Sequence, residues 1–558
     1  MNNSDQRSLK GVALIGLAMM LLLGVIAIIG DSFEHGQQIA KPTVAVVAML
    51  LVATALSVWA IRLGLRIADG AGQLLWLILC VGIGFRAVML LTPPILEVDY
   101  YRYLWDGKVV QAGVSPYRYS PQVVIDASLP QSPAAADDED LETLVELANA
   151  PSNHEILSRV HYPKLTTIYP PTSQLVFWLV AKTVPSESSV RLHVLIIRAA
   201  FVLFDVGTIV LLAMMLRQLD RHLAWLMAYA WNPLVIKEIA NSGHLDSLAV
   251  FLIVLAAMML LNVRGDRSLS SALASGFALG LAVGAKLFPV ILVPAFVARL
   301  SAFGWKGSAG FCSAFFIVCL AVLYPMSDNY FANVDSKSAQ RDAIHNQSDD
   351  SERTSPLDSD GLSEFLSTWR MNDAIFSAVY FNLKPESDTA KNYWYVITPS
   401  ELRQQVAQLE NHQFFRANPA FALTRLLTLA VFGVFYLVML RRFRRSDEQG
   451  FLCGILILLA LFLMLQPTIN PWYWVWVVPF TCFSSRWSWP AISGVLLIYY
   501  IRFCFIESSL EFECWQCVYQ GVQIFDHFVV WIELILIIAF VTIAGRLDAK
   551  QSTSRPVL

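Results

Sequence analysis

The chain has 558 residues, of which 56% are hydrophobic and 15% are charged. Soluble domains carry roughly 25% charged residues, so the composition excludes an ordinary soluble domain and indicates an integral membrane protein. The net charge of −3 argues against a nucleic-acid partner, and the positions of Lys and Arg are more informative than their number.

Apolar runs predict an all-α polytopic membrane protein, because each could cross about 30 Å of hydrocarbon. The first run follows Lys10 and is too long for the core of a signal peptide, so it predicts a retained start-transfer helix. We expect about 14 transmembrane helices, near residues 11–30, 43–62, 71–92, 191–216, 223–240, 245–263, 270–285, 287–299, 308–326, 420–440, 451–466, 472–484, 488–506 and 524–545.

The spacing of these runs divides the chain into five segments. They are N-terminal transmembrane helices (1–92), a first large outer loop with juxtamembrane helices (93–190), a transmembrane core (191–326), a second outer loop (327–418) and C-terminal transmembrane helices (419–558). In the second outer loop, the Ser- and Asp-rich half (335–361) predicts a flexible segment. The half after it (362–418) has enough aromatic residues to fold.

Lys and Arg occur in every second short loop, which sets the orientation. Arg7 and Lys10 at the start, the four arginines within 441–445, and Arg546 with Lys550 at the end all fall on the cytoplasmic side. Both termini are therefore predicted to be cytoplasmic, and 170–184 must be a re-entrant or surface helix. In this orientation, the unusual polar stretches all lie on the side of the membrane opposite the cytoplasm.

The first such stretch, residues 97–120, combines aromatic rings with acids and cations. Asp99, Tyr103 and Asp106 follow one another at spacings that place them on roughly one face of a helix. A carboxylate among these rings, such as Asp99, could accept a proton from a hydroxyl. The alternative is an interfacial helix with an aromatic belt and solvated charges.

A second group surrounds a turn at 241–246. Lys237 and Glu238 are either functional intramembrane charges or interfacial residues whose ends reach water. His244 and Asp246, on the same side as Asp99, could bind a phosphate or a divalent cation such as Mg²⁺ or Mn²⁺.

Further candidates follow along the chain. Lys286, next to a proline break, could reach a lipid phosphate or complement a helix dipole. Arg198 and Asp205 are predicted to pair within one span, as is Arg86 with some acid. Asn470-Pro471 predicts a bend where Trp472 and Tyr473 could stack on a sugar, although such aromatics also form interfacial belts.

The eight cysteines suggest no metal site. Six lie in or at the ends of apolar runs and are predicted to be packing residues. Cys514 and Cys517 form a CxxC in a polar loop, where a disulfide is plausible but not decided, and one pair is too few for a zinc site.

Taken together, five motifs resemble the GT-C superfamily of integral membrane glycosyltransferases, and within it the bacterial polyprenol-phosphate-mannose-dependent mannosyltransferases. The motifs recur in the family's order over residues 97 to about 475. They are Asp99-Tyr-Tyr-Arg-Tyr-Leu-Trp-Asp-Gly-Lys with Gly113-Val-Ser-Pro-Tyr, Tyr169-Pro-Pro-Thr-Ser-Gln, Trp231-Asn-Pro-Leu-Val-Ile-Lys-Glu-Ile-Ala-Asn-Ser-Gly-His-Leu-Asp, Gly280-Leu-Ala-Val-Gly-Ala-Lys-Leu-Phe-Pro, and Asn470-Pro-Trp-Tyr.

This resemblance implies a GT-C-like helix bundle in the bacterial inner membrane, with a periplasmic active site and a polyprenyl-monophosphate sugar as donor. It implies that an acid in the first outer loop is the catalytic base, which by position is Asp99. We expect Lys286, Arg102 and His244 to bind the donor phosphate. The acceptor or sugar would contact Asp106, Tyr103, Trp105, Asp246, Asn470, Trp472 and Tyr473.

The chain departs from the family pattern in two places: two extra spans come first, and the 327–418 loop is long. The loop leaves the acceptor, a glycan or glycolipid, undefined. Alternative functions are a transporter or flippase of lipid-linked sugars, which should show paired repeats, and a polymerase or ligase acting on pyrophosphate-linked glycans.

Overall fold

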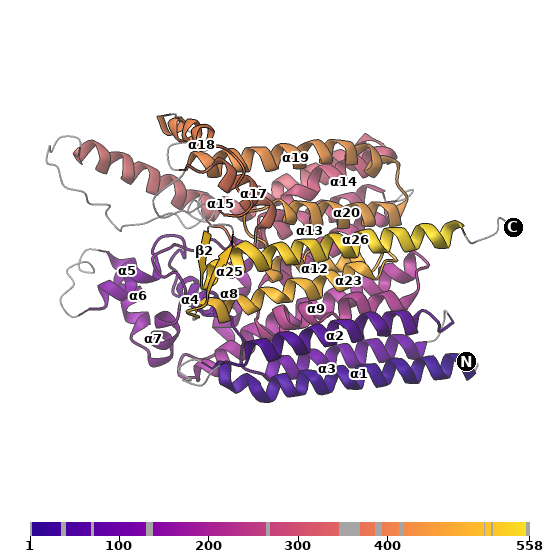
Figure 1. Ribbon diagram of the computed structural model, residues 1–558. Helices are drawn as coiled ribbons and strands as arrows, with labels where there is room; N and C mark the ends of the chain where they lie inside the picture. The colour runs from indigo at the N-terminus through magenta and orange to yellow at the C-terminus, as the bar shows by residue number, and fades with distance from the viewer. Residues whose placement is uncertain are drawn as a thin grey trace.

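A computed structural model describes residues 3–34, 41–68, 72–129, 138–263, 268–344, 369–385, 393–411, 418–506, 508–514 and 517–553. Nine helical segments among them are long and apolar enough to cross a membrane, and they run side by side (Figure 1). They include α1 (Asn3–Gly30), α2 (Thr43–Gly64), α3 (Gly72–Leu91), α9 (Val190–Gln218), α13 (Ser268–Ala285), the first part of α15 (Trp305–Ile344), α19 (Pro419–Arg445), α23 with α24 (Ser488–Leu496, Arg502–Ile506) and α25 with α26 (Val522–Ile524, Val530–Thr553).

The structure confirms an all-α polytopic membrane protein but not the count of 14 spans. Two predicted spans are chains of short turns. Residues 223–240 form η3 (Leu223–Leu226), α10 (Met227–Ala230), α11 (Pro233–Val235) and most of the π-helical turn η4 (Ile236–Asn241). Residues 472–484 fall in α21 (Pro471–Trp474) and α22 (Val478–Thr481). Pro233, Pro471 and Pro479 lack the N–H that would extend a preceding helix, which accounts for the breaks.

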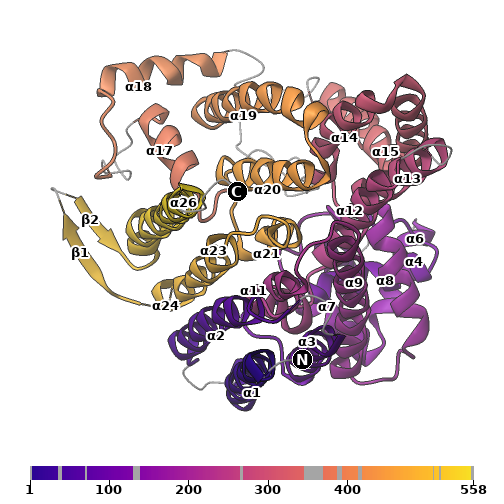
Figure 2. The same cartoon turned by 90° about the vertical axis from the view of Figure 1, so that its right-hand side faces the viewer.

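Three predicted spans form shorter apolar segments. They are α12 (Asp246–Leu261), η6 with α14 (Phe288–Leu292, Val293–Leu300) and α20 (Glu448–Met464). Viewed along the helix axes, α9 lies between α3 and α12, and α2 packs beside α23 (Figure 2).

Short helices gather at one end of the bundle. They are α4 (Tyr100–Gln111), α5 (Pro121–Ala127), α6 (Glu139–Ala148), α7 (Pro151–Ser158), α8 (Pro171–Thr183), α17 (Ala374–Leu383) and α18 (Ser400–Ala407). The first and last described residues lie at the other end (Figure 1). α4 and α8 approach closely because Gly107 has no side chain: a Cβ there would lie 2.4 Å from the carbonyl oxygen of Phe177.

An antiparallel hairpin, β1 (Glu511–Cys514) and β2 (Cys517–Gln520), is the exception to the helical fold. Its register sets Cys514 opposite Cys517. The side chains of these cysteines lie outside the described part of the chain.

The first part of the predicted flexible segment 335–361 is helical. Residues 335–344 continue α15 as helix, and 345–361 lie outside the described residues. In the following half of the loop, α17 packs on the start of α19 through a small cluster, Phe376, Tyr380, Ala420 and Phe421.

The structure confirms that Arg86 pairs with an acid inside the bundle, whereas the predicted pairing of Arg198 with Asp205 is wrong. Arg86, not Arg198, pairs with Asp205, with Nε and Oδ2 2.5 Å apart, and both side chains are buried. Arg198 instead donates to the carbonyl oxygens of Met89, Thr92 and Ala240. These carbonyls are available because the chain leaves helical geometry at 92 and at the π-helical turn.

Candidate active site

Asp99 lies at the start of α4, on the end of the bundle that carries the short helices. The residue as a whole is partly exposed. Burial among its neighbours, together with the charge of Glu97, raises the pKa of Asp99 to about 7. A carboxylate with such a pKa is suited to accept a proton near neutral pH.

Glu97 holds this segment in place. Its Oε1 accepts hydrogen bonds from the backbone N–H groups of Val98 and Asp99, both at 2.8 Å. Its Oε2 lies 3.1 Å from Nε2 of His244. Sequence reasoning missed Glu97 as a site residue, because only the fold brings it to the distant turn at 244.

His244 is buried between two acids. Its Nε2 also lies 3.4 Å from Oε2 of Glu238, and its ring stacks on Trp472 with centroids 4.7 Å apart. Burial opposes its charge, but Glu97 and Glu238 raise the pKa of His244 to about 10. In turn, although burial opposes it, the charged His244 lowers the pKa of Glu97 to about 2.

The side chains of Lys237 and Glu238 do not reach water. Both are buried, so the interfacial alternative is wrong. Lys237 Nζ lies 3.5 Å from Oε2 of Glu238 and 3.6 Å from the centre of the Tyr500 ring. The Tyr500 hydroxyl donates to Glu238 at 2.7 Å, a contact that sequence spacing gives no sign of.

Asp246 and Lys286 form the second charged pair of the site. Lys286 Nζ lies 2.6 Å from Oδ1 of Asp246, and the indole N–H of Trp476 donates to the same oxygen at 2.5 Å. The Lys286 side chain remains 21% exposed, with Nζ 4.8 Å from the centre of the Tyr473 ring. Asp246 Oδ2 has no hydrogen-bond partner among the described residues.

The structure thus brings together Asp99, His244, Asp246, Lys286, Trp472 and Tyr473. A chain of contacts links them: Glu97 joins Asp99 to His244, the His244 ring stacks on Trp472, and Tyr473, beside Trp472, contacts Lys286. The charges of His244, Lys286 and Asp246 all act on Asp99. Asn470 occupies the N-cap position of α21, without a side-chain capping bond, directly before Trp472 and Tyr473. It is buried, and its Oδ1 has no partner within the described chain.

The rest of the α4 candidates are engaged elsewhere. Arg102 donates to Asp106 at 3.0 Å and to the carbonyl oxygen of Leu165 at 2.9 Å. Asp106 also accepts from Gln174 at 3.2 Å. Tyr103 is buried against Phe177, with ring centroids 4.9 Å apart, and Trp105 is buried as well. These residues fix α4 against α8 rather than turning toward Lys286.

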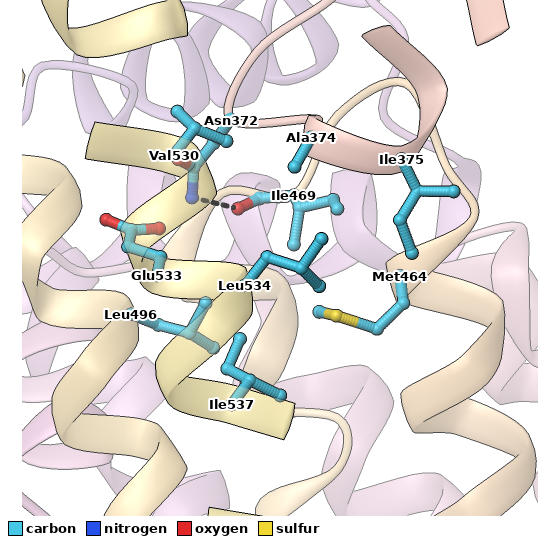
Figure 3. A pocket seen from close by; sticks show the side chains of 10 residues that line it. All are labelled: Asn372, Ala374, Ile375, Met464, Ile469, Leu496, Val530, Glu533, Leu534 and Ile537. Carbon is cyan, nitrogen blue, oxygen red and sulfur yellow. Dashed lines mark hydrogen bonds between the residues drawn. The ribbon is translucent and has the colours of Figure 1, made fainter. Parts of the chain in front are cut away.

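The second outer loop reaches the site through residues 369–373. Met371 N donates to Pro467 O at 2.8 Å, and Ile469 N donates to Met371 O at 2.9 Å. Asn372 Nδ2 donates to Ile469 O at 3.1 Å (Figure 3). Figure 3 also shows the pocket beneath this contact, which Leu496, Leu534 and Ile537 line together with Glu533.

A divalent cation fits poorly with these residues. Within the described ranges, no three His, Cys, Asp or Glu side chains converge in a way that could hold a metal ion. We therefore derive no step through a metal.

The chain is a helical membrane protein with a cluster of acids, cations and aromatic rings at one end of the bundle. Residues 167–354 match the family model of glycosyltransferase family 87, and residues 402–512 match that of the MptB C-terminal domain. These matches support a mannosyltransferase-like GT-C protein, as the five motifs predicted. No curated protein and no solved structure matches the chain.

The matches indicate a glycosyltransferase. Both begin after the Asp99 stretch, so the role of Asp99 depends on the geometry of the site.

Proposed function

We propose that the protein transfers a hexose, mannose in the first instance, from a polyprenyl-monophosphate donor to a glycan or glycolipid acceptor. The observation that supports this most directly is the position of Asp99. Glu97 joins the backbone of Asp99 to the His244 ring, the pKa of Asp99 is raised to about 7, and the charges of His244 and the partly exposed Lys286 act on its carboxylate.

The reaction is a single displacement with inversion. Asp99 removes the proton of the acceptor hydroxyl while that oxygen forms a bond to the anomeric carbon. The bond between the anomeric carbon and the phosphate oxygen breaks, and polyprenyl phosphate leaves with the electron pair. Lys286 and His244 stabilise the charge that grows on the phosphate.

Arg102, the third residue expected to bind phosphate, has a different place in this proposal. Its hydrogen bonds to Asp106 and to the carbonyl oxygen of Leu165 hold the first turns of α4 in position. Asp106 accordingly supports Arg102 rather than a sugar hydroxyl.

The hexose of the donor lies over Trp472 and Tyr473. The free Oδ2 of Asp246 and Oδ1 of Asn470 are acceptors for its hydroxyl groups, since a buried acceptor without a partner is costly. Tyr103 and Trp105 form the packed wall behind Asp99.

We place the protein in the bacterial inner membrane with both termini in the cytoplasm and the site in the periplasm. The basic short loops support this orientation, and the first and last described residues lie at the end of the bundle opposite α4 (Figure 1).

The donor class is tested with purified protein in proteoliposomes. Mannose labelled on a polyprenyl monophosphate, on a polyprenyl pyrophosphate and on a nucleotide is offered in turn, with cell-envelope glycans as acceptors. We expect label in the glycan from the monophosphate donor alone. Transfer from the pyrophosphate donor would favour a polymerase or ligase, and movement of the intact donor across the bilayer without transfer would favour a flippase.

A further inference from the structure

We infer that Tyr162 and Trp369 form an aromatic platform that stacks on a pyranose ring of the acceptor and so presents its hydroxyl group to Asp99. This inference depends on the proposed function. It names the acceptor as a carbohydrate and assigns it a binding site made by both outer loops.

Tyr162 has an unusual backbone conformation. Its backbone has φ of +50°, a left-handed conformation that is uncommon for a bulky residue and recurs at ligand sites. Its side chain is nevertheless 47% exposed, so burial of the ring does not explain the conformation. The ring of His161 supports it edge-on, with centroids 4.0 Å apart.

Trp369 completes the platform from the second outer loop. Its ring centroid lies 4.7 Å from that of Tyr162. The Trp369 carbonyl oxygen accepts from Thr468 Oγ1 at 3.3 Å, and Met371 pairs with Thr468 as a bridge. The tryptophan is therefore held against the chain that leads to Asn470, Trp472 and Tyr473.

The platform lies next to the proposed base. The segment that carries Tyr162 is bonded to the start of α4 on both sides. Before Tyr162, Arg159 donates to the Tyr101 hydroxyl at 2.9 Å, and burial together with the charge of Asp99 raises the pKa of Tyr162. The carbonyl oxygen of Leu165, three residues after Tyr162, is bonded to Arg102 of α4. The 160–165 segment thus lies over the start of α4.

An ion pair lies near the segment that carries Trp369: the hydroxyl of Tyr499, three residues before Arg502, donates to Sδ of Met371 at 2.8 Å. Arg502 forms two hydrogen bonds to Asp526, at 2.9 and 3.2 Å, and its charge also acts on Tyr162. A pyranose has an apolar C–H face, which packs on an aromatic ring, and an edge of hydroxyl groups, which bond to guanidinium and carboxylate groups. The rings of Tyr162 and Trp369 could pack on the C–H face of a pyranose, and the Arg502–Asp526 ion pair could bond to its hydroxyl groups.

An interfacial aromatic belt is the main competing explanation. Belt residues project from spanning helices at the level of the lipid headgroups. Tyr162 and Trp369 instead lie on non-helical segments outside the candidate spans and beside the charged site. The position favours a polar ligand.

Binding is tested without relying on turnover. Saturation-transfer NMR is recorded on the detergent-solubilised full chain with methyl α-mannoside and with an α-linked mannobiose, for the wild type, Tyr162→Ala, Trp369→Ala and Tyr162→Phe. We expect saturation of the sugar C–H protons in the wild type and in Tyr162→Phe, and a loss of at least fivefold in both alanine variants. Trp305→Ala, which changes an exposed tryptophan at the start of α15, is the control and should retain the signal.

Transfer kinetics give a second measurement. The alanine variants should raise the KM for the acceptor at least tenfold while leaving the KM for the donor unchanged. An absent wild-type signal, or alanine variants that retain both the signal and the acceptor KM, would overturn the platform. Since a failure of transfer in the wild type itself would instead count against the proposed function, the two failures are distinguishable.

Discussion

Glu97 links the proposed base to His244: its two carboxylate oxygens bind the backbone N–H of Asp99 at 2.8 Å and His244 Nε2 at 3.1 Å. One side chain thereby joins the first outer loop to the turn before α12. The segment that carries Asp99 is positioned by a charge pair rather than by packing alone.

Replacing Glu97 with Gln should lower kcat at least tenfold and shift the acid limb of the pH profile to lower pH. The shift follows because the negative charge of Glu97 raises the pKa of Asp99, while Glu238 remains 3.4 Å from His244 and keeps that ring charged. Initial rates across pH, with the melting temperature as a control for folding, measure both effects. An unshifted profile would remove Glu97 from the role of positioning Asp99.

The pH dependence of the wild type follows from Asp99 itself. A general base must be ionised to act, and Asp99 has a pKa of about 7, so kcat/KM for the acceptor should fall about tenfold per pH unit below that value and level off above it. Glu97, Asp246, His244 and Lys286 are the charged neighbours that set the pKa. A profile that stays flat between about pH 5 and 8 would be incompatible with this assignment.

Lys286→Met should reduce kcat by about 10²–10³, the usual effect of losing one group that stabilises transition-state charge. Lys286→Arg keeps the cation and should retain most of the activity. Because Lys286 also pairs with Asp246, the melting temperatures of both variants are compared with that of the wild type. Equal losses of activity in the two variants would mean that geometry, rather than charge, is what the site requires.

Arg86→Met tests the ion pair that holds α3 against α9. Leaving Asp205 buried without its partner should destabilise the protein by about 3–5 kcal/mol, whereas Arg86→Met with Asp205→Leu should recover most of that loss. Thermal unfolding in detergent measures the difference. If the double variant is less stable than the single one, the pair is not the source of the effect.

The sequence predicted the membrane fold and pointed to much of the candidate site because both leave local signals. The run of acids and rings after Asp99, the proline break after Lys286 and the Asn470-Pro471 bend each stand out in an apolar chain. The ion-pair partners of buried charged residues were harder to predict. Arg86 and Asp205 are 119 residues apart, and nothing in their spacing distinguishes that pair from Arg198 with Asp205.

The prediction of a transmembrane helix at residues 223–240, which rested on hydropathy, was also wrong. An apolar stretch of this length resembles a spanning helix, but Asn232-Pro233 breaks it, and Asn232 caps the next turn by accepting from the N–H groups of Leu234 and Val235. Lys237 and Glu238 are buried just beyond that break. Their burial depends on Tyr500 and His244, which no local pattern connects to them.

The most direct test of the central claim compares Asp99→Asn with the wild type in a transfer assay with polyprenyl-monophosphate mannose. Asp126→Asn, an exposed carboxylate of the same loop, is the control. The account predicts that Asp99→Asn loses about 10²–10⁴ in kcat with its melting temperature and donor binding unchanged, while Asp126→Asn behaves as wild type. Near-normal turnover by a folded Asp99→Asn protein would contradict it.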